Sequence, residues 1–428
     1  MNAQLLIAYN FPPRSNAESI VTANMVSAVA DLGWKSTVCT GRIEPASIGA
    51  DNTLLGLLPR DLVVCRCAEL PLQKLLRLLR VLRLKTLVTL LSSFPDESVF
   101  WLPTALRLLK RLQRSHRWDV IHSRSLPMGG HLLGFYAKRL LRLPWLAHFS
   151  DPWVDSPFYT SISPTVRSLH ERWERTIIGG ADRVTFTNEV ALQRVMAKYP
   201  REWSEKCHVV PHGFVRAFSP ALSHAPLEAG CLNIVYLGSF YGIRQPEPIF
   251  RALHALRFDE EVRRYVRIWL VGRMPLERFA SEAKALGIES MVRLLPPVAH
   301  SSALQMGRGA DVLLTVDSRC EHSDIFSPSK LIEYLGMGKP IWGVVAPGSA
   351  NAKLVEAARG CVADVGDPAD VADSLRWIVG QWKQRRLRAP DLNHPEIYRH
   401  EMSRTARHLE GILKQMLCLP NDAKAKEV

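Results

Sequence analysis

The chain has 428 residues, 47% of them hydrophobic and 22% charged. Because a single hydrophobic core rarely extends beyond about 250–300 residues, this length predicts two packed domains, and the composition excludes a disordered or low-complexity protein. The formal net charge of +14 indicates a basic surface that attracts nucleic acid, anionic lipid or diphosphates, and charge alone does not choose among these partners.

The first ordered segments are typical of a parallel α/β sheet. A buried-type strand at 5–9 runs through Phe11-Pro12-Pro13 into an apolar-periodic helix at 18–32. The alternation of strands and helices then continues, so one Rossmann-like domain is complete by about residue 211. Further strands are expected at 36–40, 62–67, 120–122, 145–149 and 183–187, and further helices at 128–141, 166–178 and 190–198.

Two basic helices are expected within this domain, at 71–91 and 102–117. Both combine apolar residues with closely spaced lysine and arginine, a composition typical of helices that lie on an anionic membrane surface. A solvated basic face and a dimer contact are the alternatives. The cations are Lys74, Arg77, Arg80, Arg83 and Lys85 in the first helix, and Arg107, Lys110, Arg111 and Arg114 in the second.

A second Rossmann-like half follows an interdomain linker. Residues 211–230 contain Pro, Gly, Ser and His without clear periodicity, and a new first strand begins at 233–238. A helix at 396–417 is left over after this half. The remaining strands are expected at 268–271, 292–295, 312–316 and 340–344, with helices between them.

No targeting or redox feature is visible. The start of the chain lacks the basic region and cleavage site of a signal peptide, and no uncharged stretch reaches the roughly 18 residues that cross a bilayer. The scattered cysteines form no Cys-x-x-Cys pair, as expected for reduced thiols in a cytosolic protein, and Cys65 and Cys67 would face one side of a strand. We therefore expect a soluble or peripheral protein.

The segment 327–340 predicts a short helix with Ser327 at its N-cap. Lys330 in the first turn opposes the helix dipole, which suggests that an anion binds there; backbone N–H groups and a lysine at a helix N-terminus suit a diphosphate. Glu333 follows one turn later, where a carboxylate can accept hydrogen bonds from both hydroxyls of a ribose. The alternative is a surface Lys330–Glu333 ion pair.

A second phosphate-binding segment is expected after the strand at 233–238, where doubly wound sheets bind phosphate. Arg244 in this loop can neutralise a leaving diphosphate, and an exposed arginine is the alternative. Two glycines do not make a GxGxxG fingerprint, so a nicotinamide or flavin site is not favoured. The donor-binding residues expected from the strand ends are Gly238, Ser239 and Gly272.

Short stretches spread over nearly the whole chain resemble the family 4 retaining glycosyltransferases, particularly bacterial surface-polysaccharide members. Each stretch is weak alone, and their order makes the resemblance fairly specific. They are Tyr9-Asn10-Phe11-Pro12-Pro13, Phe94-Pro95-Asp96 with Trp101, Ser150-Asp151-Pro152-Trp153, Val210-Pro211-His212-Gly213, 236–242 and 327–340.

This resemblance implies a GT-B fold, with two Rossmann-like domains, a cleft between them and a C-terminal helix that crosses back to the first domain. The acceptor would bind mainly to an N-terminal domain at 1–211, and the nucleotide diphosphate sugar mainly to a C-terminal domain at 231–395. The helix at 396–417 would pack on the N-terminal domain.

The resemblance also assigns donor-site residues. Glu333 matches the second glutamate of the family's Glu-x7-Glu motif, which holds the ribose, and Ile325 stands in place of the first. Backbone amides near Phe326 and Ser327 would contact the sugar instead.

The diphosphate and acceptor sides depart from the family as well. The family's Arg-x4-Lys pair appears here as Ser239 and Arg244, so Lys330 would act with Arg244 on the leaving group. Ser150 stands where related sequences usually carry Arg. His148 and Asp151 end a predicted strand at the expected cleft and are assigned to catalysis, and a packed core histidine is the alternative for His148.

These inferences predict a retaining glycosyltransferase in surface polysaccharide or lipopolysaccharide synthesis. It would use a nucleotide diphosphate sugar and a lipid-linked or glycan acceptor, at the cytoplasmic face of the cell membrane. No Ser-His-Asp or Cys-His set and no cluster at metal spacing is visible, so we expect no cofactor and no obligatory metal. The alternatives are a GT-B sugar-nucleotide epimerase and a non-catalytic basic binding protein; no nucleic-acid-binding module is visible.

Overall fold

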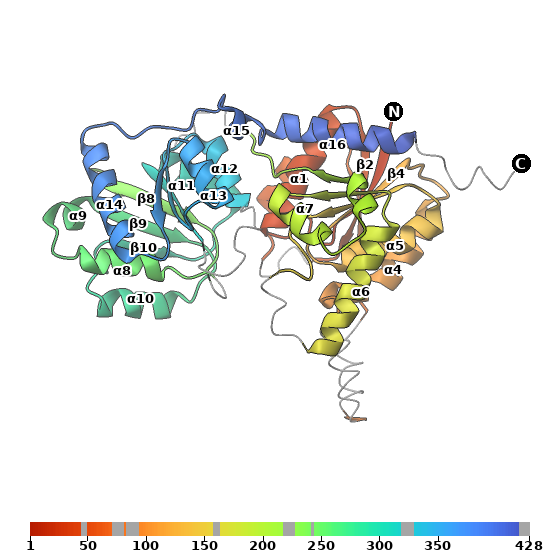
Figure 1. Ribbon diagram of the computed structural model, residues 1–428, viewed down its shortest axis with the longest axis horizontal. Helices are drawn as coiled ribbons and strands as arrows, with labels where there is room; N and C mark the ends of the chain where they lie inside the picture. Colours follow the sequence, from red (N-terminus) through yellow and green to blue (C-terminus); the bar gives the residue numbers. More distant parts are fainter. Residues whose placement is uncertain are drawn as a thin grey trace, which may run out of the picture. The chain divides into compact units, whose positions relative to one another are not determined.

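The computed structural model describes residues 1–43, 49–70, 81–82, 94–156, 163–216, 227–240, 244–317 and 329–418. The chain divides into two compact units, Met1–Pro211 with Thr405–Val428 and His212–Arg404. Each unit is a parallel β-sheet with helices packed on both of its faces (Figure 1). The predicted α/β class with two Rossmann-like domains is therefore confirmed.

The first unit contains a seven-stranded sheet in the order β3-β2-β1-β4-β5-β6-β7. The order reverses direction between β1 and β4, so this sheet has the switch point of a doubly wound fold. The strands are β1 (Ala3–Ile7), β2 (Lys35–Gly41), β3 (Val63–Cys67), β4 (Val120–Arg124), β5 (Trp145–Phe149), β6 (Arg183–Phe186) and β7 (Cys207–Val209).

Alternating residues of β1 serve the two faces of this sheet, as the period of a strand requires. Leu6 packs with Val26 of α1 and Val38 of β2, whereas Leu5 and Ile7 belong to the larger core that α4 and α5 cover. The helical segments are α1 (Ala17–Asp31), η1 (Asn52–Leu57), η2 (Glu97–Trp101), α4 (Leu102–Leu112), α5 (Gly129–Leu141), α6 (Pro164–Gly180), α7 (Glu189–Met196) and η4 (Arg201–Lys206).

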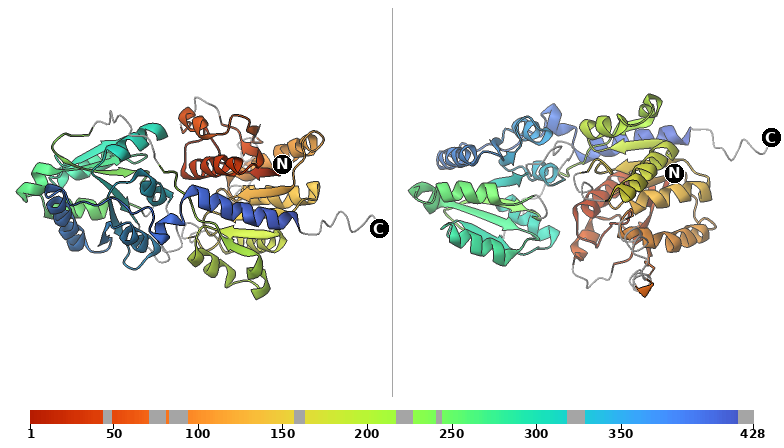
Figure 2. Two further views of the ribbon diagram at one scale, coloured as in Figure 1. Left: turned by 90° about the horizontal axis from the view of Figure 1, so that it is seen from above. Right: turned by 60° about the horizontal axis from the view of Figure 1, so that its bottom comes forward.

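The final helix, α16 (Met402–Leu417), contributes most of its length to the first unit. It lies near α1 in two views (Figures 1 and 2), and Trp34 Nε1 donates a hydrogen bond of 3.4 Å to Glu410 Oε1. The predicted continuous helix at 396–417 is wrong in one detail. It is interrupted between α15 (Pro395–Tyr398) and α16, because Phe214 exchanges backbone hydrogen bonds with His400 and Met402.

The second unit contains a six-stranded sheet in the order β10-β9-β8-β11-β12-β13, which reverses direction between β8 and β11. Its strands are β8 (Leu232–Leu237), β9 (Val266–Val271), β10 (Val292–Leu295), β11 (Val312–Val316), β12 (Ile341–Val345) and β13 (Cys361–Asp364). Its helices are α8 (Glu247–Ala255), α9 (Glu260–Tyr265), α10 (Leu276–Ala285), α11 (His300–Gly309), α12 (Ser329–Met337), α13 (Ala350–Ala357), α14 (Pro368–Lys383) and α15.

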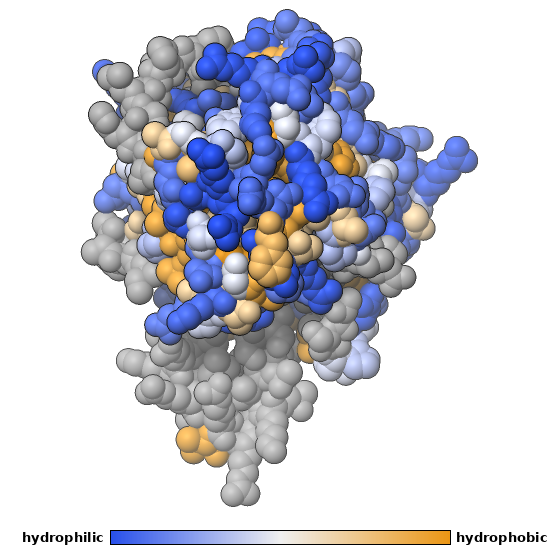
Figure 3. Space-filling view, turned by 90° about the vertical axis from the view of Figure 1, so that its left-hand side faces the viewer, coloured by the Kyte–Doolittle hydropathy of each residue, from blue (hydrophilic) through white to orange (hydrophobic). Residues whose placement is uncertain are grey.

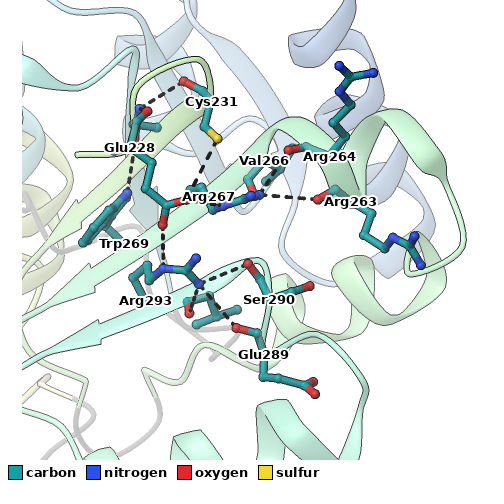
Figure 4. Close-up of polar contacts among 12 residues, drawn as sticks. Glu228, Cys231, Arg263, Arg264, Val266, Arg267, Trp269, Glu289, Ser290 and Arg293 are labelled. Atoms are coloured by element: carbon teal, nitrogen blue, oxygen red, sulfur yellow. Dashed lines mark hydrogen bonds and ion pairs between the residues drawn. The ribbon is translucent and has the colours of Figure 1, made fainter. Parts of the chain in front are cut away.

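One carboxylate links three segments at the amino edge of the second sheet. Glu228 Oε2 and Oε1 accept hydrogen bonds of 2.7 Å from Arg267 Nε of β9 and Arg293 Nε of β10 (Figure 4). Burial opposes the ionisation of Glu228, but the hydrogen bonds and charges of the two arginines outweigh it and lower the pKa of this carboxyl. The charges of Glu228, Arg267 and Arg293 are therefore paired with one another.

Of the two predicted basic helices, the structure describes mainly the second. The helix at 71–91 lies outside the described residues except for 81 and 82. The helix at 102–117 ends at Leu112, because Ser115 and His116 turn back to bond the Leu112 carbonyl. Its apolar stripe, including Ala105 and Leu109, is buried in the first core and does not face a bilayer. Within Leu102–Leu112 the exposed residues are Arg107, Lys110 and Arg111, and the predicted cation Arg114 is exposed just beyond the end of the helix. Within the described ranges, no helix is both long and apolar enough to span a membrane.

Candidate functional site

Polar and glycine residues follow three neighbouring strands of the second sheet at its carboxyl edge. Gly238 follows β8, Gly272 follows β9, and Asp317 follows β11. Because β9, β8 and β11 are adjacent and parallel, these residues lie together, and Gly238 N donates to Val271 O at 2.8 Å. This is the edge at which open α/β sheets bind ligands.

The two glycines permit a close approach that other residues would block. Gly238 and Gly272 have φ values of 149° and 148°, which side chains rarely adopt. A Cβ atom on Gly238 would lie 2.7 Å from Cδ and 2.8 Å from Cε of Lys330, and one on Gly272 would collide with the carbonyl group of Gly238. Glycine at 238 therefore accepts this backbone conformation and leaves room for the Lys330 side chain at the end of β8.

Lys330 lies in the first turn of α12 and points to the end of β8. Its Nζ donates to Tyr236 Oη at 2.7 Å and lies 4.2 Å from the centre of that ring, and Tyr236 Oη in turn donates to Ser239 O at 3.2 Å. Burial and the charge of Arg244 lower the pKa of Lys330 well below its usual range, against the opposing effect of Asp317. The ammonium form thus lacks part of the compensation that a charge needs inside a protein.

Asp317 is the carboxylate that acts on these cations. It is 7% exposed, and its Oδ2 accepts a hydrogen bond of 2.8 Å from Asn351 Nδ2. Burial raises the pKa of Asp317, although the bond from Asn351 and the charges of Arg244 and Lys330 act in the opposite direction. Within the described residues the centre thus contains two cations and one buried carboxylate that resists ionisation, an arrangement that a bound anion would complete.

Glu333 and Lys330 have different partners. Glu333 Oε1 is 2.7 Å from His300 Nε2 at the start of α11, whereas Lys330 contacts Tyr236, so the alternative of an i,i+3 ion pair does not hold. Helix α12 is fixed next to β8, because Leu237 N donates to Tyr334 Oη at 2.8 Å. The site thus keeps a carboxylate one helical turn from the lysine.

Three predicted donor residues cannot be placed. Ile325, Phe326 and Ser327 lie outside the described residues. Sequence reasoning missed Tyr236, His300 and Asp317. Asp317 directly follows a predicted strand, so the rule that selected Asp151 could also have selected Asp317. Nothing in the sequence shows that Tyr236 contacts Lys330 or that His300 contacts Glu333.

The predicted catalytic residues of the first unit lie at the end of β5. His148 is 2% exposed, and its Nδ1 is 2.9 Å from Thr185 Oγ1 of β6. Asp151 is half-buried and follows Ser150 in the turn after the strand. A contact of either side chain with a substrate remains a prediction.

A buried network holds that turn, and sequence reasoning missed its central residue. Glu18 Oε1 accepts a hydrogen bond of 2.8 Å from Arg124 Nε, and Ser150 Oγ lies 2.7 Å from Glu18 Oε2 and from Ser125 O. Burial raises the pKa of Glu18, and Arg124 and Ser150 offset part of this effect. Glu18 is therefore a positioning residue for the segment that carries Asp151.

Two arginines lie at the carboxyl edge of the first sheet. Arg14, after β1, lies 5.0 Å from the centre of the Tyr9 ring and donates to Arg42 O at 3.3 Å. Arg66 of β3 donates to Pro12 O, and burial together with the charge of Arg14 lowers its pKa. Among the described residues, Arg14 Nε and Arg66 Nη1 are buried without a hydrogen-bond partner. The pair therefore offers positive charge to an anion.

Comparison with known proteins supports the fold and the class of enzyme. The family described as glycosyl transferase 4-like domain matches residues 19–213. D-inositol 3-phosphate glycosyltransferase from Corynebacterium kroppenstedtii is 24% identical over 70% of this chain and 68% of its own length. Among solved structures, sucrose-phosphate synthase from Thermosynechococcus elongatus matches with a TM-score of 0.67 at 15% identity, over 97% of this chain and 99% of its own. WaaG, a glycosyltransferase involved in lipopolysaccharide biosynthesis, matches with a TM-score of 0.59 at 14% identity, over 97% and 98%.

The fold and these matches define a glycosyltransferase with the GT-B fold. The matched glycosyl transferase 4-like domain covers most of the first unit, and the chain is similar to family 4 glycosyltransferases.

Proposed function

We propose that this enzyme transfers a sugar, with retention of configuration, from a nucleotide diphosphate sugar to a phosphate-bearing acceptor in surface polysaccharide or lipopolysaccharide synthesis. The observation that carries the proposal is the centre at the carboxyl edge of the second sheet. There Lys330 and Arg244 act on one another and on Asp317, and Glu333 lies one helical turn away.

The donor would bind with its diphosphate at Lys330 and Arg244 and its ribose at Glu333. A diphosphate would place negative charge beside Lys330, whose ammonium form is disfavoured by burial, and would restore a favourable environment for that group. Glu333 offers two acceptor oxygens, of which Oε1 is near His300. Retaining His300 as a partner would hold the carboxylate in place for the ribose hydroxyls.

The chemical step needs no protein nucleophile. The bond between the anomeric carbon and the leaving phosphate oxygen breaks, the acceptor oxygen bonds to the same face of that carbon, and the acceptor's hydroxyl proton passes to the departing phosphate. Lys330 and Arg244 would stabilise the charge that develops on this phosphate, which is the largest contribution such a site can make. The proposal includes no obligatory metal, because these cations supply the positive charge.

An anionic acceptor is supported by the first unit. Arg14 and Arg66 offer buried donors without partners in the described part of the chain, and guanidinium groups match phosphate in geometry and charge. The name of the corynebacterial relative also gives a phosphorylated acceptor. A lipid-linked acceptor bears phosphate too, and exposed Arg107, Lys110 and Arg111 would attract an anionic membrane surface at the cytoplasmic face.

The first test is a thermal-shift and turnover screen of the purified protein against a panel of nucleotide diphosphate sugars. One donor should raise the melting temperature, and Glu333→Gln and Arg244→Ala should each abolish that shift, whereas the exposed control Lys353→Gln should keep it. No response to any donor or free nucleoside diphosphate would overturn the proposal. Conversion of the donor into an epimer, without transfer, would favour the epimerase alternative.

The acceptor is tested separately with the active donor. Inositol phosphate, a polyprenyl diphosphate-linked sugar and an unphosphorylated glycan are offered in parallel, and the stereochemistry of the product is read by NMR. Transfer to a phosphorylated acceptor that weakens in Arg14→Gln and Arg66→Gln supports the acceptor proposal. Equal transfer to the unphosphorylated glycan in all variants contradicts it.

Attachment to the membrane is tested by flotation with anionic liposomes. Replacing Arg107, Lys110 and Arg111 with Gln should reduce binding, because each cation near the surface contributes up to about 1 kcal/mol. Undiminished flotation of this variant would contradict the role of these three cations.

A further inference from the structure

A separate cavity opens at the amino edge of the second sheet. It has a volume of about 680 Å³, and its walls include Val312 at the start of β11, Ile341 at the start of β12 and Cys361 at the start of β13. Trp377 and Gln381 of α14 and the loop 385–388 complete it. The volume falls within the roughly 300–1,000 Å³ that is typical of small-molecule sites.

The cavity is distinct from the donor site. Strand β11 runs from Val312 in the cavity wall to Val316, and Asp317 of the donor site follows at the other end. At a rise of about 3.3 Å per residue, the two sites are roughly 17 Å apart along this strand. A ligand in the cavity therefore lies too far from Lys330 to take part in the transfer reaction.

The walls of this cavity are strongly basic. Arg385, Arg386 and Arg388 are exposed and form no ion pair within the described part of the chain, and the lining contains no acidic side chain. A fourth arginine, Arg359, pairs with Asp391 at 3.2 Å, where both side chains are largely exposed. The cavity thus contains more positive charge than its surroundings neutralise.

The backbone does not account for the arginines at two of these positions. Arg359 and Arg385 adopt φ values of 58° and 55° just after α13 and α14, in the left-handed conformation that usually takes glycine at a helix end. A third such residue, Arg142, ends α5 in the first unit. Arginine therefore stands at 359 and 385 although the backbone conformation there favours glycine.

An aromatic side chain adds an apolar wall. Trp377 is 52% exposed, although large apolar side chains are mostly buried in this unit. The side of the second unit around α8, α9 and α14 is mainly hydrophilic, with isolated apolar side chains exposed among polar ones (Figure 3). An indole beside several guanidinium groups suits a ligand that combines a phosphate with a flat ring.

We propose that this cavity binds a small phosphate-bearing ligand, with its phosphate held by Arg385, Arg386 and Arg388 and its organic ring packed against Trp377. Guanidinium groups bind phosphate with two parallel hydrogen bonds, which makes them more selective than lysine for this group. The site is independent of the donor site and of the reaction proposed there.

The test uses the full-length protein and isothermal titration with two probes, pyrophosphate and ADP. Lys330→Gln/Glu333→Gln removes two side chains of the proposed donor site, and this variant should still bind either probe. Adding Arg386→Gln/Arg388→Gln should weaken that remaining binding about tenfold or more. Arg263→Gln/Lys284→Gln, which removes two exposed cations outside the cavity wall, is the matched control and should leave it unchanged.

Trp377→Leu separates the two halves of the ligand. It should weaken ADP and leave pyrophosphate almost unaffected, because only ADP has a ring. Vesicles with and without phosphatidylglycerol form a further arm: binding to the anionic vesicles that depends on Arg386 and Arg388, without binding of the free probes, assigns the phosphate to a lipid headgroup. Absence of all three interactions in the Lys330→Gln/Glu333→Gln variant would overturn the proposal, whatever the fate of the donor site.

Discussion

One charged cluster at each edge of the second sheet combines a carboxylate with two cations, and the pKa of the carboxylate is shifted in opposite directions in the two clusters. At the amino edge, Glu228 contacts both Arg267 and Arg293 at 2.7 Å, its side chain is 33% exposed, and its pKa is lowered. At the carboxyl edge, the pKa of Asp317 is raised and that of Lys330 is lowered.

The difference lies in burial and contact. Glu228 is hydrogen-bonded to its cations near solvent, so each charge stabilises the others. Asp317 instead accepts its hydrogen bond from Asn351, and Lys330 donates to a neutral tyrosine, so burial dominates both pKa values. The arginines paired with Glu228 stabilise the fold, whereas Lys330, which is buried and hydrogen-bonded to a tyrosine, is suited to binding an anion.

The largest expected effect is at Lys330. Lys330→Gln should lower kcat/KM for the donor about 100- to 1000-fold, as expected when one group that stabilises developing charge is removed. Steady-state kinetics with the donor identified in the screen measures this effect, and Lys353→Gln is the control. A loss of less than about threefold in kcat/KM corresponds to under about 1 kcal/mol. Such a small loss would contradict a role for Lys330 in the donor site.

Gly238→Ala should be the next largest. The new methyl group meets Lys330 and demands a φ of 149°, so we expect a destabilisation of about 2 kcal/mol together with weaker donor binding. Chemical denaturation and nucleotide titration measure the two effects. Gly380→Ala in α14 is the control, because no atom lies within 4 Å of its Cβ position; it should stabilise by about 0.5–1 kcal/mol. Equal behaviour of the two variants would contradict the close approach at Gly238.

Glu228→Gln should destabilise the protein by about 1 kcal/mol, a modest value because the carboxylate is one-third exposed. The lowered pKa means that the stability from Glu228 is present above its unfolded pKa and disappears as pH falls through the folded value.

Asp317→Asn should show the opposite pH dependence. The raised pKa of Asp317 means that its folded-state advantage exists at low pH and is lost as pH rises from about 3.8 through the folded value. Urea unfolding of both variants and the parent across the acidic range measures the two slopes. Slopes of the same sign would break the contrast between the two edges.

The smallest expected effect is proton uptake on donor binding. A bound diphosphate should raise the lowered pKa of Lys330, so binding at a pH above its value in the free protein takes up a fraction of a proton. Titration in buffers of different ionisation enthalpy measures this fraction. Lys330→Gln should abolish it, and persistence of the uptake in that variant would assign the proton to another group.

The same contrast explains how much of the molecule could be predicted. The strands at 292–295 and 312–316 were predicted at their observed bounds, because a short buried run between turn residues is a local signal. The basic helix at 102–117 was predicted too long, and its apolar stripe is buried in the core of the first unit. The sequence of its apolar stripe does not show whether the stripe faces a bilayer or another helix. In the structure it packs on α5.

The sequence by itself determined the two-sheet α/β architecture, because the periodicity of apolar residues is a local signal. It also determined that Gly238 follows a strand, that Lys330 lies in the first turn of a helix and that Glu333 lies one turn later, because turn and capping residues mark these positions. Only the tertiary structure decided the partners. Lys330 meets Tyr236 across 94 residues, and Asn351 reaches Asp317 across 34. Such contacts depend on strand order and on helix placement. They fix the burial of each charge, and burial decides whether a cation stabilises the fold or is suited to bind a phosphate.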